Sequence, residues 1–117
     1  MKLILKAIKD IFQGKAPLLG AKRSGHWPKV RADFLSKNPT CAACGGKDSL
    51  EVHHVEPFHI NPSLELDESN LITLCESSRR CHLEIGHHGR WSNVNPNVVE
   101  EAATALAKIS LPSVEVP

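Results

Sequence analysis

Four cysteines, arranged as two pairs, constrain the fold of this 117-residue chain more than any other feature. The first pair lies in Cys41-Ala-Ala-Cys44-Gly-Gly, a tight turn in which two glycines let the backbone fold beneath a metal ion. The second pair, Cys75 and Cys81, begins after thirty intervening residues. Thiolates from two distant turns suit tetrahedral coordination, so we predict that all four cysteines hold one structural Zn²⁺.

Other interpretations of the cysteines are a redox pair, a disulfide framework or free thiols in the core. A redox Cys-x₂-Cys usually opens a helix after a strand, whereas this one follows Asn38-Pro39 and precedes a strand-like segment. Disulfides need an oxidising compartment, of which the sequence gives no sign. Zinc is therefore favoured, and the wider Cys-x₅-Cys pair can converge on it if Cys75 ends a strand and Cys81 lies in the first turns of a helix.

A modest hydrophobic core makes such a metal useful. Only five residues are aromatic, and a chain of this length with so few large rings needs further stabilisation. The formal net charge is only +1, so there is no general argument for a polyanionic partner. Between residues 15 and 37, however, six basic residues accompany only Asp33, which fits either a solvated basic surface or a set of phosphate contacts.

The sequence also bears on location. No apolar run approaches the roughly 20 residues that a bilayer-spanning helix needs, so we expect no membrane partner. We do not expect the N-terminal MKLILKAIKDIF to be a signal peptide, because Lys6 and Lys9 interrupt its apolar run and no small-residue cleavage site follows. We interpret it as an amphipathic helix over residues 2–12 and expect a cytoplasmic protein.

The remaining elements are helices and two short strands. A helix should begin at Trp27-Pro28 and end near Asn38-Pro39, because the residue before a proline is pushed out of the α region. SLEVHHVEP and NLITLC are strand candidates, separated by an irregular loop. ESSRRCHLEIG should be a short helix capped by Ser77 or Ser78 and stopped by Gly86, and a closing helix should cover residues 97–109.

These elements predict a single α+β domain over residues 1–117. Its parts are an N-terminal helix with a basic connector, a central core, and a C-terminal helix with its tail, at residues 1–26, 27–94 and 95–117.

His53 and His54 lie side by side in the first predicted strand. Neighbouring side chains of a strand point to opposite faces, so the two imidazoles cannot both bind one ion unless the strand ends or bends there. We therefore expect the strand to end or distort at His54, or the two histidines to have different roles. His82 directly follows Cys81, and neighbours on a helix lie about 100° apart, so one short helix can serve a zinc site and a second site.

Asn70 precedes the second predicted strand, at the end of loop 55–69. Its amide both donates and accepts hydrogen bonds, so it can clamp the backbone of a long irregular loop. An ordinary turn residue before a strand is an equally good interpretation of its position.

The chain resembles the HNH endonuclease family. The resemblance rests on CAAC, HHVEP and NLITLC followed by CH, together with the series His54, Asn70 and His82. The upstream WPKVRADFLSKNPTCAACG also resembles the small phage- and prophage-type members. The resemblance covers roughly residues 27–88. It implies a ββα-metal core, also called the His-Me finger, in which two antiparallel strands and a helix surround one divalent cation.

The resemblance also implies roles for individual residues. His53 and His82 match the metal ligands, His54 matches the general base, and Asn70 matches the asparagine that orients the base. The zinc knuckle of the cysteine-containing subset matches Cys41, Cys44, Cys75 and Cys81. Some relatives carry a second helix histidine four residues after the first; here that position is Gly86, and His87 can serve as a third ligand only if the helix has already unwound.

The implied function is metal-dependent hydrolysis of DNA, as nicks or double-strand breaks, by a monomer or homodimer. A neutral imidazole at His54 can take a proton from water, and a divalent cation (Mg²⁺, Mn²⁺, Ni²⁺, Co²⁺ or Zn²⁺) can act as Lewis acid. Candidates for phosphate contacts are Arg79, Arg80, Arg90, Lys29 and Arg31. The alternative is a non-catalytic, zinc-stabilised module that binds nucleic acid or protein, although such a module has no need for His53, His54 and His82 in this arrangement.

Overall fold

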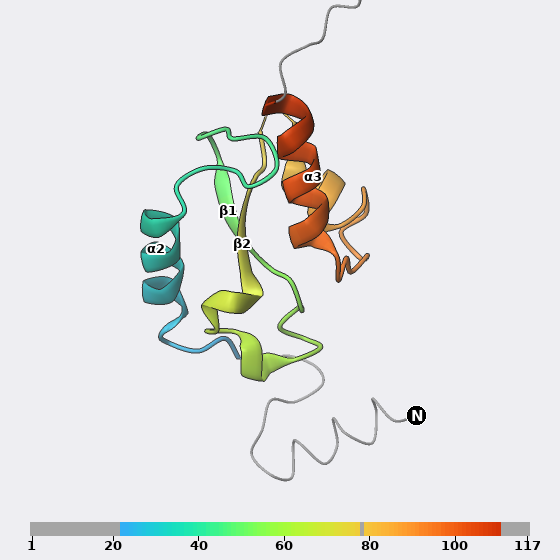
Figure 1. Ribbon diagram of the computed structural model, residues 1–117. Coiled ribbons are helices and arrows are strands. Elements are labelled where there is room, and N and C mark those ends of the chain that lie inside the picture. The colour runs from blue at the N-terminus through green and yellow to red at the C-terminus, as the bar shows by residue number, and fades with distance from the viewer. Residues whose placement is uncertain (1–21, 78, 111–117) are drawn as a thin grey trace, which may run out of the picture.

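A two-stranded antiparallel sheet forms the centre of the computed structural model, which describes residues 22–77 and 79–110. Its strands are β1 (Leu50–His54) and β2 (Leu71–Cys75), with His54 opposite Leu71 in the register. Helix α2 (Trp27–Lys37) precedes the sheet, and the short helix η3 (His82–Gly86) and helix α3 (Val98–Ser110) follow it (Figure 1). This is the α+β class that the sequence predicted. The helix expected over residues 2–12 lies outside the described residues.

The two faces of the sheet are covered by different helices. On one face, Phe34 of α2 packs against Val52 and Leu71. On the other, Leu74 joins a buried cluster with Val98 and Ala102 of α3. Figure 1 shows α2 and α3 on opposite sides of the strands. All five residues of β2 are buried, which explains why four of them are apolar instead of alternating with polar residues as in a half-exposed strand.

Helix α2 has the predicted boundaries. Pro28 lies in its first turn, where a missing backbone N–H costs nothing, and Lys37 is its last residue. The side-chain amide of Asn38 donates to the Phe34 carbonyl (3.0 Å), and Thr73 donates from Oγ1 to the Asn38 carbonyl (2.9 Å). The end of α2 is thereby joined directly to strand β2.

The connection between the strands is largely irregular, as expected, but it contains two short 3₁₀ turns. These are η1 (Pro62–Leu64) and η2 (Glu68–Asn70). The Asp67 carboxylate accepts a hydrogen bond from the backbone N–H of Ser69 (2.9 Å) and so caps the second turn. Strand β1 ends at His54, as the paired histidines led us to expect.

The helix expected to begin near Ser77 begins later than predicted. Its first residue is His82, and it is a π-helix without a side-chain cap. The physical reason is the backbone of Arg80, whose φ of 50° belongs to the left-handed region and cannot continue a right-handed helix. Ser77 instead donates from its hydroxyl to the Asp48 carbonyl (3.2 Å).

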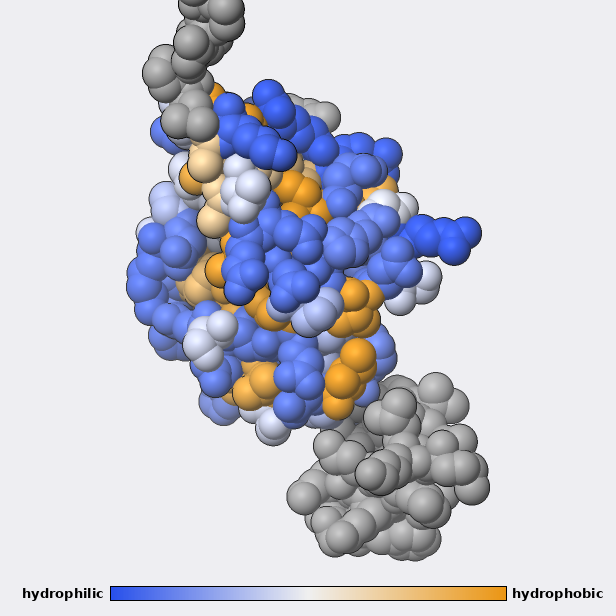
Figure 2. Space-filling view, turned by 45° about the vertical axis from the view of Figure 1, so that its right-hand side comes forward, coloured by the Kyte–Doolittle hydropathy of each residue, from blue (hydrophilic) through white to orange (hydrophobic). Residues whose placement is uncertain are grey.

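Hydrophilic residues dominate the surface in Figure 2, where hydrophobic residues form separate small patches. Within the described ranges, no helix is both long and apolar enough to cross a membrane.

Gly86 marks the closest approach between η3 and the sheet. A Cβ atom added there would lie 3.1 Å from Leu74 Cδ1 and 3.3 Å from His53 Nδ1. Both neighbours are buried, so they have little room to move away. The glycine therefore allows η3 to sit directly on the strands.

Replacing Gly86 with alanine should destabilise the protein. Overpacking costs about 1–3 kcal/mol, and the better helix propensity of alanine offsets at most about 1 kcal/mol. We expect urea denaturation to show a net loss of about 1–2 kcal/mol in the free energy of unfolding. The matched control is Gly25→Ala, whose added Cβ meets nothing within 4 Å and should change stability by less than about 0.5 kcal/mol. Equal stability of the two variants would contradict this packing.

Candidate active site

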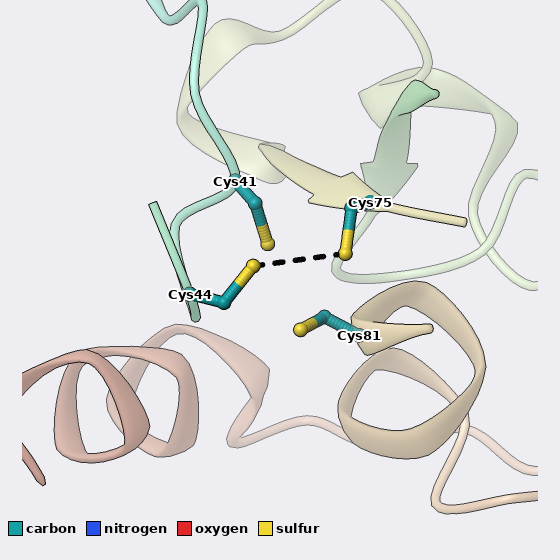
Figure 3. Close-up of side chains that lie close together, drawn as sticks. All are labelled: Cys41, Cys44, Cys75 and Cys81. Carbon is teal, nitrogen blue, oxygen red and sulfur yellow. Dashed lines mark hydrogen bonds between the residues drawn. The ribbon is translucent and has the colours of Figure 1, made fainter. Parts of the chain in front are cut away.

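The four cysteines converge at one corner of the sheet. Cys41 and Cys44 come from the turn before β1, Cys75 ends β2, and Cys81 directly precedes η3 (Figure 3). Their sulfur atoms all lie within 4.8 Å of one another, and Cys44 and Cys75 are 3.7 Å apart. Four sulfurs at 2.3 Å from a tetrahedral Zn²⁺ would be separated by about 3.8 Å. The wide spacing of the second pair is therefore no obstacle, because a strand end and a helix start bring it together.

The first pair sits on a hydrogen-bonded turn. The backbone N–H of Cys41 donates to the Gly46 carbonyl (2.7 Å), and that of Gly45 donates to the Cys41 carbonyl (2.8 Å). Gly45 has a φ of 77°, which favours glycine. The N–H of Ala42 donates to the Thr73 carbonyl (2.9 Å), so the turn is attached to β2.

The chemistry of the cysteine cluster also fits zinc. Burial raises the pKa of the thiols of Cys44 and Cys81, which therefore need a nearby cation to ionise at neutral pH. A coordinating Zn²⁺ deprotonates its thiol ligands and supplies that charge. The cluster could thus hold one structural zinc ion.

A second cluster consists of three histidines. His53 of β1, His82 of η3 and His87 just after η3 each offer one ring nitrogen within 4.8 Å of the others. His53 Nδ1 and His82 Nε2 are 3.1 Å apart. Two nitrogens bound at about 2.0–2.1 Å to one cation would be about 2.9 Å apart at a right angle and 3.4 Å apart at a tetrahedral angle, so the observed distance fits a shared ion.

A π-helix brings His87 into this cluster. The sequence placed His87 one residue too late for an α-helix, so we expected it to contribute only if the helix had unwound. Instead the helix is wider: i→i+5 hydrogen bonding of π-type places residues five apart near the same face. His82 and His87 are five apart.

The imidazoles of His82 and His87 each have a hydrogen-bond partner at Nδ1. His82 Nδ1 lies 2.9 Å from the Glu76 carboxylate, and His87 Nδ1 lies 2.9 Å from the Asn93 carbonyl. Both partners are acceptors, so Nδ1 carries the proton and Nε2 of each ring is free to bind a cation.

The burial of His53 determines the charge state of its ring. Its Nε2 is buried and has no hydrogen-bond partner among the described residues, whereas buried polar atoms are almost always paired. Burial and the neighbouring imidazoles of His82 and His87 lower the pKa of His53 to about 3, so the ring is neutral at physiological pH. A neutral, buried imidazole whose Nδ1 faces two other imidazoles can act as a metal ligand through that nitrogen, and the unpaired Nε2 is the other nitrogen of the ring. The residues fit a divalent cation.

His54 points to the opposite face of the strand, as alternation requires. Its ring packs against Trp27 with centroids 4.5 Å apart, and its Nε2 lies 2.9 Å from the Glu65 carbonyl. A carbonyl only accepts, so Nε2 carries the proton and Nδ1 is left as the basic nitrogen. Burial lowers the pKa of His54, which keeps this ring neutral. The adjacent histidines therefore have separate environments.

Asn70 makes the clamp that its amide was expected to make. Oδ1 accepts from the Glu56 backbone N–H (2.8 Å), while Nδ2 donates to the carbonyls of Glu56 (3.0 Å) and Leu64 (3.3 Å). These bonds tie the start of the loop to its middle, next to the residue that holds His54. Asn70 thus fixes the backbone that orients the imidazole.

A cleft of about 630 Å³ opens over both histidine environments. Among the described residues, its lining includes six histidine or arginine side chains and no carboxylate. These six are Arg23, His53, His54, His59, His82 and His87. Such a lining favours an anionic occupant.

The five basic residues that we singled out for phosphate contacts do not line this cleft. Lys29 pairs with Asp33 (3.0 Å), and Arg31 pairs with Glu51 (3.2 Å). The other three, Arg79, Arg80 and Arg90, are exposed. Arg79 lies near Cys81 and α3 and not near the histidines. Their roles on DNA stay predictions.

Arg23 was counted only as one member of the basic segment, yet it is the arginine at the cleft. Its guanidinium carbon lies 4.7 Å from the Phe58 ring centroid, and Nη1 lies 3.7 Å from the Glu65 carboxylate. Glu65, Glu76 and Trp91 were also missed. Only Glu76 carried a sequence signal, because it directly follows Cys75, a predicted zinc ligand.

Comparison with known proteins agrees with this geometry. The family model described as HNH endonuclease matches residues 41–88. The matched segment, which is less than half of the chain, is thus similar to the HNH family. No match was found among curated proteins or among solved structures. The match includes both clusters, both strands and η3, so the matched segment has the two-strand-and-helix arrangement expected of a ββα-metal fold.

Removing one thiol should empty the cysteine site. We expect elemental analysis of the purified protein to find about one tightly bound zinc per chain, and Cys44→Ser to reduce it strongly because a closed tetrahedral site needs four ligands. Unfolding should then occur at lower temperature, since zinc binding contributes folding energy. His53→Ala, which leaves every thiol in place, is the control and should retain zinc. Folded wild-type protein without tightly bound zinc would overturn this assignment.

The two neighbouring histidines after η3 offer a matched test of the second cluster. His87→Ala should weaken Ni²⁺ binding by about tenfold or more, measured by titration calorimetry on protein whose cysteine site already holds zinc. His88 is half-exposed and hydrogen-bonds Glu101 (2.8 Å) instead of the cluster, so His88→Ala should bind Ni²⁺ as the wild type does. Equal affinities for the two variants would exclude His87 as a ligand.

Proposed function

We propose that this chain is a metal-dependent DNA endonuclease that uses His54 as general base. HNH domains are found in nucleases, and this one has the residues for phosphodiester hydrolysis in one cleft. The observation that carries the proposal is the pairing of adjacent residues: His53 belongs to a three-histidine cluster, while His54 is fixed by the Glu65 carbonyl. That division supplies a metal ligand and a base side by side.

His54 provides the proton acceptor. Because Nε2 donates to the Glu65 carbonyl, Nδ1 is the nitrogen that accepts a proton from an attacking water. Asn70 holds the loop that carries Glu65, so it acts on the reaction through the orientation of His54. Trp27 packs against the other side of the ring and limits its rotation.

His53, His82 and His87 would hold the divalent cation. When bound, the cation neutralises phosphate charge and stabilises the departing oxygen as a Lewis acid. Three neutral imidazoles leave its positive charge uncompensated, which favours an anionic substrate. Imidazole ligands suit Zn²⁺, Ni²⁺, Co²⁺ or Mn²⁺ better than Mg²⁺, which prefers oxygen.

The lining of the cleft supports DNA as the substrate. Among the described residues, its only formally cationic side chain is Arg23, whose planar guanidinium lies near the rings of Trp27 and Phe58 and beside the Glu65 carboxylate. A guanidinium fixed in this way is well placed to bind a phosphate oxygen without reading the base sequence. We infer that Arg23 contributes to backbone contacts.

Plasmid relaxation tests the enzyme directly. Purified wild-type protein with Mn²⁺, Ni²⁺, Co²⁺ or Mg²⁺ should convert supercoiled DNA to nicked or linear forms. His54→Ala should slow this conversion by about 10²–10⁴-fold, because the general base is lost. His59 lines the same cleft but is exposed, so His59→Ala is the matched control and should keep most of the activity. If the wild type cuts with none of these metals, the proposal fails and a zinc-stabilised binding module takes its place.

A further inference from the structure

Trp91 is the most exposed large apolar side chain in the described part of the protein. Its exposed fraction is 56%. The indole nevertheless lies against the histidine cluster, with its centroid 5.1 Å from those of His82 and His87. An exposed indole in contact with two candidate metal ligands is not explained by core packing.

The aromatic residues of the described part of the chain are concentrated around the histidines. Of the five in the sequence, Phe12 lies outside the described residues and Phe34 packs in the core. The other three surround the histidines: Trp27 packs on His54, while Phe58 and Trp91 line the cleft. A chain with few large rings thus has most of its described ones at the candidate site.

The cleft between these rings suits a nucleotide. Phe58 and Arg23 belong to one part of the lining, and Trp91 belongs to a separate segment that also contributes Ser92, Asn93 and Val94. The lining has cationic and neutral polar groups for a phosphate, and an aromatic surface for a base. In the part of the chain that the structure describes, no carboxylate lines the cleft to repel the phosphate.

Bases of a paired duplex are stacked inside the helix, where a ring at the rim of a cleft cannot reach their faces. Stacking on a paired base requires the duplex to be locally unstacked, whereas an unpaired base is already accessible. Aromatic stacking tolerates any base, because every base has a π-face.

We propose that Trp91 stacks on an unpaired nucleobase next to the phosphodiester in the cleft, so that the site favours DNA with unpaired nucleotides over fully paired duplex. This inference rests on the proposed function for the location of the phosphodiester. It adds a substrate class: single strands, gaps, overhangs or junctions.

Trp91 can be tested without cleavage. All measurements use the His54→Ala variant, so that the bound DNA stays uncut, with Zn²⁺ in both clusters. Zn²⁺ has no redox chemistry and therefore causes no oxidative damage to the DNA. Oligonucleotides carry 2-aminopurine, whose fluorescence falls when it stacks, at successive positions in single-stranded, gapped and fully paired DNA. We expect quenching at one or two positions of the unpaired substrates, and binding of those substrates about 5- to 100-fold tighter than that of the paired duplex.

Two substitutions of Trp91 separate stacking from a structural role. Trp91→Leu should abolish the quenching and weaken single-strand binding by about 5- to 100-fold, while Trp91→Phe should retain much of both. The control Val99→Ala removes an exposed apolar side chain of α3, 52% exposed, and should change neither. Calorimetric Zn²⁺ binding by the histidine cluster should be unchanged in Trp91→Leu.

Each other outcome overturns the inference. Unchanged quenching in Trp91→Leu would exclude stacking, and weakened Zn²⁺ binding with normal oligonucleotide binding would assign Trp91 to positioning His82 and His87. Equal affinity for paired and unpaired DNA would exclude the substrate class. Failure of the proposed function is a separate result, because it appears as an absence of plasmid cleavage by the wild type, whereas stacking is measured on uncut DNA.

Discussion

The convergence of four thiols at one corner of the sheet is the constraint on which the candidate site depends. Cys75 is followed by Glu76, which contacts His82, and Cys81 is followed by His82 itself. Constraints on the positions of these two cysteines therefore also constrain the His82 imidazole and the Glu76 carboxylate that contacts it. Three of the thiols are buried in the same cluster as Leu74, Val98 and Ala102, so the candidate zinc site is part of the small core and not an addition to it. The packing of the core and the geometry of the candidate site are thus coupled through the chain neighbours of two candidate zinc ligands.

Features set by local geometry could be read from the sequence. The separation of His53 from His54 follows from the two-residue period of a strand, and the end of α2 follows from Pro39. The spacing of the cysteines was enough to predict one cluster, because tetrahedral ligation accepts few alternatives. The α+β class was predictable because each element has its own short pattern of apolar residues and turns, whereas the ββα core was implied by the resemblance to the HNH family.

Features set by contacts between distant segments could not be read in this way. The π-helical form of η3 depends on Gly86 packing against Leu74 and His53, and on the left-handed backbone at Arg80, neither of which has a signature in composition or spacing. The selection of Arg23 over other basic residues depends on Glu65, which lies 42 positions away in the chain. Basic residues are numerous in this segment, and only tertiary contacts decide which of them faces the cleft.

Glu65 contacts both His54 and the segment that carries Arg23. Its backbone carbonyl accepts from His54 Nε2, whereas its carboxylate, only 5% exposed, accepts from the Ser24 backbone N–H (3.0 Å) and lies beside Arg23. A buried carboxylate needs such partners, because an unpaired buried charge is strongly unfavourable. The basic connector is consequently held by the same residue that orients the imidazole. His54 and Arg23 are thus both linked to one residue of the loop, and Trp27 at the start of α2 lies near both side chains as well.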